Sequence, residues 1–220
     1  YLPWILKRDR TRWSNASVDW TTIPAPGQSG APLIQGIWAT IEDAVVNAVP
    51  ADLDGDGQRE ILFQSYDGKL HAWWLDKTEK HSWPYTIPGS GFRFGAEPAV
   101  ADLNGDGFAE VIFTTWPQKG GNAVGKLIIL SYQGTLLTSV DLPAPRGGTW
   151  NGGLAAPTLV QLDADANWEA VIGTSQSGVV VYELQGSANT TLRWGTARGS
   201  LLRNGQPPAA GDSLFGSGFE

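Results

Sequence analysis

The chain has 220 residues, among them 28 Gly, 14 Pro and 11 Trp, and carries a net charge of −7 at pH 7. This aromatic content is too high for a disordered chain, and the acidic balance argues against nucleic acid as a partner, because its binders carry basic patches. There is no Cys, which excludes disulfides and thiolate metal sites, and no apolar run approaches the roughly 20 residues of a transmembrane helix. We therefore expect no transmembrane segment. Because Met is absent even at position 1, we expect a processed form or a part of a longer protein.

Three short segments hold ten of the 22 acidic residues. We name them loop one (residues 52–60, DLDGDGQRE), loop two (102–110, DLNGDGFAE) and loop three (161–169, QLDADANWE). Loop three is a weaker copy of the other two. The loops begin 50 and 59 residues apart, and self-similarity at such a period indicates a repeat array, a solenoid or a propeller.

Short β-type runs surround each loop at matching places. The runs are 45–50, 61–63, 69–75 and 83–87 around loop one, 98–100, 111–113, 126–132 and 136–142 around loop two, and 157–160, 170–172, 179–184 and 190–194 around loop three. No long stretch has a helical period. Four short strands per unit predict an all-β fold made of β-propeller blades of four antiparallel strands. A β-sandwich is the alternative.

Linkers rich in Pro and Gly divide the chain into units. We predict the outer strands of a partial blade at 1–23, a first repeat with an insertion at 24–89, a second repeat at 90–145, a third at 146–195, and a closing segment with a flexible tail at 196–220. Propellers have at least four blades. We therefore expect neighbouring blades or a second chain to be needed for closure.

The linkers and loops resemble the FG-GAP repeat, also called the VCBS-type repeat. The resemblance rests on the linker FGAEP at 94–98, the linker GAP at 30–32, and the pattern DxDGDGxxE, which loop one has in full and loop two has with Asn104 at the third position. It extends from residue 24 to about residue 195 and is weaker in the third unit. The resemblance implies a propeller like the heads of integrin α subunits and of secreted bacterial proteins, an extracellular location, and calcium in the loops.

The loops carry the ligand chemistry that calcium prefers, which is six to eight oxygens from a flexible backbone. Carboxylates at alternate positions of a tight loop can converge on one point. The candidate ligands are Asp52, Asp54, Asp56, the Gln58 carbonyl and Glu60 in loop one, Asp102, Asn104, Asp106, the Phe108 carbonyl and Glu110 in loop two, and Asp163, Asp165, Asn167 and Glu169 in loop three. A metal-free Asp/Gly turn is the alternative, but four carboxylates this close repel one another without a cation. We predict structural calcium in loops one and two and allow a third ion in loop three.

No catalytic set is recognised, so we predict that these residues are not an enzyme. Residues 27–33 resemble the nucleophile segment of trypsin-like proteases, but no His, the base that such a nucleophile needs, precedes His71. Trp150, in the Gly-rich stretch 147–153, and Trp116 are candidate ligand residues that could stack on a sugar. Packing between blades is the alternative for both rings.

These features predict a secreted or cell-surface calcium-binding β-propeller that acts in adhesion or binds a glycan or protein ligand. Two alternatives stay open. The chain could be an accessory propeller of a larger secreted enzyme, or a structural subunit of an extracellular filament or layer.

Overall fold

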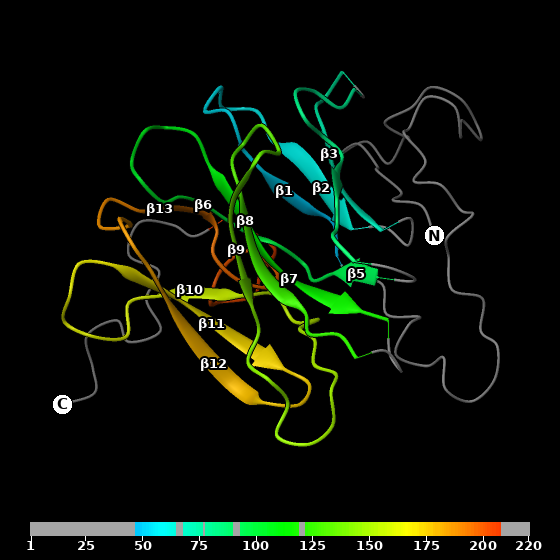
Figure 1. Ribbon diagram of the computed structural model, residues 1–220. Helices are drawn as coiled ribbons and strands as arrows, with labels where there is room; N and C mark the ends of the chain where they lie inside the picture. Colours follow the sequence, from blue (N-terminus) through cyan, green and yellow to red (C-terminus); the bar gives the residue numbers. More distant parts are fainter. Residues whose placement is uncertain (1–46, 65–67, 77, 90–92, 119–121, 208–220) are drawn as a thin grey trace.

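The computed structural model describes residues 47–64, 68–76, 78–89, 93–118 and 122–207. The predicted partial blade at 1–23, the insertion and the end of the predicted tail lie outside these ranges. Within them the chain forms thirteen strands in three antiparallel sheets and no helix (Figure 1), so no helical membrane span is found there either. The prediction of an all-β fold is confirmed, whereas the described residues do not form a closed ring.

The first sheet surrounds loop one and has the predicted four strands. They are β1 (Val49–Ala51), β2 (Glu60–Gln64), β3 (Lys69–Trp73) and β4 (Tyr85–Thr86), hydrogen-bonded in that order. Every neighbouring pair is antiparallel. The strands are short because a turn or loop interrupts the chain after each one.

The second sheet repeats this order around loop two and gains a strand on its inner edge. Its strands are β6 (Ala99–Asp102), β7 (Glu110–Pro117), β8 (Lys126–Leu130) and β9 (Leu136–Asp141), with β13 (Thr191–Trp194) paired to β6 and β5 (Arg93–Gly95) paired to the far end of β7. The short strand β5 was not predicted. It forms because the linker backbone at Phe94 and Gly95 lies beside Trp116 and Thr115.

The third sheet departs from the prediction, because its fourth strand pairs elsewhere. It contains β10 (Thr158–Val160), β11 (Trp168–Thr174) and β12 (Gly178–Leu184). The strand predicted at 190–194 forms as β13, but it joins β6 of the second sheet. Our assignment of this strand to the third unit was therefore wrong. Trp194 explains the difference: it is only 4% exposed, and its side chain is buried in the core that the first two sheets share.

Two apolar cores hold the sheets together, and the second sheet contributes to both. Successive side chains of a strand point to opposite faces. On β7, Val111 and Phe113 pack against the first sheet, whereas Ile112 packs against the third. The strand is buried on both faces, which fits the continuous apolar run at 111–113. Each fully buried side chain of this size contributes about 1.5–3 kcal/mol.

Two linker glycines allow each unit to pack on the one before it. A Cβ added at Gly95 would lie 1.9 Å from Nε2 of Gln64, and one at Gly153 would lie 2.6 Å from Oγ1 of Thr114. Gln64 and Thr114 occupy the same place, four residues after the end of their respective loops. Glycine is required in these linkers because the preceding unit fills the space that a side chain would take.

Candidate metal centre

The three acidic loops occupy the same place in the three sheets. Each joins the first strand to the second, between β1 and β2, between β6 and β7, and between β10 and β11. Gly55 and Gly57 have φ of 76° and 84°, and the matching glycines of loop two, Gly105 and Gly107, have 76° and 93°. This left-handed backbone favours glycine. In loop three, Ala164 and Ala166 stand at these positions and do not adopt it, so this loop follows a different path.

The aspartate at position 1 organises the turn in loops one and two. One carboxylate oxygen of Asp52 accepts the Gly55 N–H at 2.8 Å and the other accepts the Gly57 N–H at 3.1 Å. Asp102 binds the matching amides of loop two at 2.7 and 2.9 Å. A carboxylate has about four acceptor sites, so each side chain retains lone pairs for a cation. In loop three, Gln161 occupies position 1 and donates to the Ala166 carbonyl at 3.2 Å instead.

A glutamate closes each loop, a role that the sequence analysis missed. Oε2 of Glu60 accepts the Leu53 N–H at 2.8 Å, and Glu110 and Glu169 accept the amides of Leu103 and Leu162 at 2.9 and 2.7 Å. The residue at position 9 therefore binds position 2 in all three loops. The signal was available, because all three loops have Glu at position 9 and this side chain is long enough to reach back across the loop.

Carboxylates converge in loops one and three. In each loop, one possible ligand atom from each of three residues lies within 4.8 Å of the other two: Asp52, Asp54 and Glu60, and Asp163, Asp165 and Glu169. Loop two does not gather three carboxylates, since it has Asn104 in place of Asp54. The side-chain Nδ2 of Asn104 donates to the Asp106 carboxylate at 2.9 Å.

The side chains at position 5 accept the backbone N–H two residues further along the loop. Asp56 accepts the Gln58 N–H at 2.7 Å, and Asp106 accepts the Phe108 N–H at 2.9 Å. In loop three, Asp165 accepts the Asn167 N–H at 2.8 Å. Each of these carboxylates therefore fixes the residue whose carbonyl we predicted to be a ligand.

Burial makes two of the closing glutamates, Glu60 and Glu110, costly to ionise. Glu60 is 1% exposed, and its burial raises the pKa of the carboxyl from an ordinary 4.5 to about 7. The charges of Asp54 and Asp56 raise this pKa further, whereas the hydrogen bond from the Leu53 N–H opposes the shift. Burial likewise raises the pKa of Glu110. A bound cation would offset both the lost hydration and the repulsion.

Loop three contains a buried carboxylate oxygen that a positive charge would stabilise. Glu169 is 4% exposed, and its Oε1 is buried without a hydrogen-bond partner while Oε2 binds Leu162. Such an orphaned carboxylate oxygen is unfavourable on its own. The residues present therefore fit a cation that prefers oxygen ligands, and calcium accepts this irregular geometry better than magnesium does.

Loops one and two are in direct contact. The Ala109 N–H donates to the Leu53 carbonyl at 2.8 Å, and a Cβ at Gly55 would lie 2.8 Å from the Gly107 carbonyl oxygen. The peptide group that donates at Ala109 also carries the Phe108 carbonyl, a candidate ligand of loop two. A shift of either backbone is therefore transmitted to the other loop.

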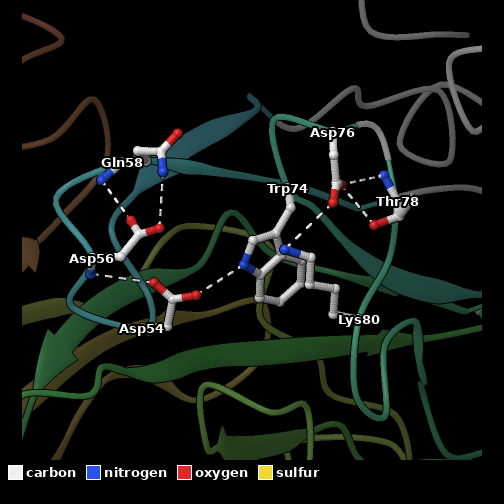
Figure 2. Close-up of polar contacts among 7 residues, drawn as sticks. All are labelled: Asp54, Asp56, Gln58, Trp74, Asp76, Thr78 and Lys80. Carbon is white, nitrogen blue, oxygen red and sulfur yellow. Dashed lines mark hydrogen bonds and ion pairs between the residues drawn. The ribbon is translucent and has the colours of Figure 1, made fainter.

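A tryptophan links loop one to the connection that follows β3 (Figure 2). Nε1 of Trp74 donates to Asp54 at 3.0 Å, and Nζ of Lys80 lies 5.3 Å from the centre of the Trp74 ring. Lys80 also pairs with Asp76 at 3.4 Å. These residues border a cavity of about 170 Å³ lined by Asp56, Gln58, Glu60, Trp74, Leu75, Asp76 and Lys80. The cavity adjoins the carboxylates of loop one, and Trp74 is positioned to respond to any movement of Asp54.

The two candidate sugar-stacking residues lie together in the second unit. The rings of Trp116 and Trp150 are 4.6 Å apart at an angle of 72°. Trp116 is 5% exposed, whereas Trp150 is half-buried and donates from Nε1 to the Pro117 carbonyl at 3.0 Å. Packing accounts for the position of Trp116. A ligand role for Trp150 stays a prediction.

Comparison with known proteins agrees with the resemblance drawn from the sequence. Residues 37–113 match a family profile described as an FG-GAP-like repeat. The match includes both loop one and loop two, while loop three lies beyond it. Searches of curated proteins and of solved structures find no significant match.

Proposed function

This chain carries an FG-GAP-like repeat over residues 37–113, and from this premise we propose that it is a calcium-stabilised binding module of the β-propeller type that works outside the cell. Its ligand would be a protein or a glycan. The three sheets would be blades of the propeller, each with its acidic loop between the first and second strands. Millimolar extracellular calcium suits loops of this kind, because extracellular modules bind calcium weakly.

One observation carries the proposal: three carboxylates of loop one converge around a buried glutamate. Asp52, Asp54 and Glu60 each place an oxygen within 4.8 Å of the others, and Glu60 is 1% exposed. With no cation, burial and repulsion both penalise this charge. With calcium, the same side chains would supply ligands and the loop would be fixed in the conformation that its glycines and hydrogen bonds already define.

The calcium would be structural in this proposal. The loops themselves supply carboxylates and carbonyls, which leaves few positions on the ion for a substrate. Among the described residues, His71 is also a poor candidate for a catalytic base, because it is only 5% exposed and a substrate could not easily reach it. We therefore propose a binding role rather than an enzymatic one for this chain.

Calcium titration tests the proposal directly. We expect calcium to raise the melting temperature and to bind measurably by calorimetry, and we expect magnesium not to replace it. Asp54→Asn should weaken calcium binding. Asp76→Asn is the matched control, since Asp76 borders the same cavity but belongs to none of the loops. Identical melting curves in calcium and in chelator would refute the calcium part of the proposal.

One of the alternatives has structural support of its own. A subunit of a filament or layer needs a surface that can receive another chain, and the described part of the third sheet ends in an unpaired strand, β12.

A further inference from the structure

The outer edge of β12 is an open strand edge in the described part of the protein. The strand pairs with β11 through seven successive residue pairs without a bulge, and no strand lies on its other side there. Figure 1 shows β12 at the margin of the described sheets. Val179 is 70% exposed and Val181 is 51% exposed. Both point to the outer face of the sheet, where Val181 lies opposite Val171 of β11.

The other edges carry features that prevent strand addition, whereas among the described residues the only such feature of β12 is the charge of Glu183 near one end. Edge strands are protected by proline, charge, bulges, short length or a covering segment. Here β1 contains Pro50, β4 has two residues, and β13 has a bulge and Arg193. The edge of β10 is bound by the Gly195 carbonyl, and β9 carries a register shift against β8. A seven-residue strand rich in Val, with no proline or bulge and with its one charge near the end, is suited to pairing.

We propose that a second copy of this chain pairs with β12 in an antiparallel arrangement, with the two-fold axis at Val181. The two third sheets then form one continuous sheet across the interface. The outer backbone groups of β12 gain hydrogen-bond partners. The two valine rows also become neighbours on one face of that sheet.

The strand is self-complementary in this arrangement. Val181 faces its own copy, and Glu183 faces Val179 of the partner, so no like charges stand opposite each other. Cross-strand pairs of β-branched residues are favourable, whereas directly opposed like charges are not. The acidic loop three lies at one end of β12, next to Glu183. Antiparallel pairing places the two copies of this loop about 20 Å apart. This distance is well beyond the screening length of about 8 Å at physiological ionic strength, so repulsion between the two acidic loops is largely screened.

The first experiment measures the mass of the 220-residue chain by sedimentation velocity over a range of concentrations. We expect a reversible dimer. Val181→Lys and Val181→Glu should each weaken association at least about tenfold, because two like charges then meet on the axis. An equimolar mixture of the two variants should associate again. Leu137→Lys, on the 55% exposed Leu137 of β9, is the matched control and should leave the dimer unchanged.

A second measurement identifies the occupant even if a variant folds poorly. Hydrogen exchange at the β12 amides of the unmodified chain should slow as the concentration rises through the dimer transition. Exchange that is slow at every concentration would mean that another segment of the same chain covers the edge, and would overturn the proposal. A wild-type monomer at all concentrations, or a dimer unaffected by either Val181 variant, would also overturn it. The proposal does not depend on calcium, so a negative calcium titration would leave it standing.

Discussion

Replacing Glu60 by Gln should stabilise the calcium-free protein at about pH 8 and reduce the stabilisation that calcium provides. Glu60 is 1% exposed, and burial raises its pKa to about 7 from an ordinary 4.5. An acid with a raised pKa in the folded state contributes full stability below pH 4.5 and loses it as the pH rises through about 7. At about pH 8, the ionised side chain therefore costs the calcium-free fold up to about 3 kcal/mol.

Glutamine removes this charge while keeping an oxygen that can accept the Leu53 N–H. In chelator at about pH 8, we expect Glu60→Gln to raise the free energy of unfolding by up to about 3 kcal/mol, which corresponds to about 6–12 °C in melting temperature for a chain of this size. At about pH 4, where Glu60 is protonated in both states, the difference should vanish. With millimolar calcium at about pH 8, the variant should gain less from the ion than the wild type, because a charged ligand is lost.

The assay is thermal unfolding by calorimetry at the two pH values, each in calcium and in chelator. Asp141→Asn is the control, because Asp141 is an exposed carboxylate paired with Lys126 and away from the loops. Its effect should stay within about 0.5 kcal/mol under all conditions. A Glu60→Gln variant that is less stable than the wild type in chelator at about pH 8 would refute the reasoning. So would a variant that gains as much from calcium as the wild type does.

Three further predictions test the loops. In chemical denaturation, Gly55→Ala should destabilise the protein by about 1–3 kcal/mol more than Gly57→Ala. The two glycines have similar φ, but only a Cβ at Gly55 would collide with the backbone of loop two, so equal losses of stability would contradict this contact. Calcium should change the emission of Trp74, which binds Asp54, and Trp74→Phe should remove the change from the fluorescence titration; a change that persists in full would come from another Trp. Asp54→Ala should lower the melting temperature in calcium more than Asp163→Ala does, since loop three lacks the position-1 carboxylate and the glycines; the reverse order would make loop three the stronger site.

Much of the site was predictable from the sequence because its determinants are local. The three loops were located by their clustered acidic residues and their repeated spacing, and Gly55, Gly57 and their counterparts in loop two adopt the φ values that the turn requires. Three of the four carboxylates of loop one, Asp52, Asp54 and Glu60, lie close together, whereas Asp56 does not belong to this group. Loop three, whose missing glycines suggested a weaker site, follows a different backbone path but still brings three carboxylates together.

Other features of the site depend on burial, which a linear motif does not specify. The closing role of Glu60 follows from a side chain that is enclosed and reaches back to Leu53. The raised pKa has the same origin. The contact between Leu53 and Ala109 joins residues 56 positions apart, and no pattern within either loop indicates it.

The sequence by itself determined the strands, the turns and the repeating acidic loops, because alternation, glycine conformation and carboxylate spacing act over a few residues. Only the tertiary structure decided which edges meet. The strand Thr191–Trp194 was predicted correctly as a strand, yet it pairs with β6, since burial of Trp194 in the core between the first and second sheets outweighs adjacency along the chain. Because β13 pairs with β6, the edge of β12 stays open among the described residues. Every strand presents the same backbone N–H and C=O groups, so the local sequence does not encode which edge receives which partner.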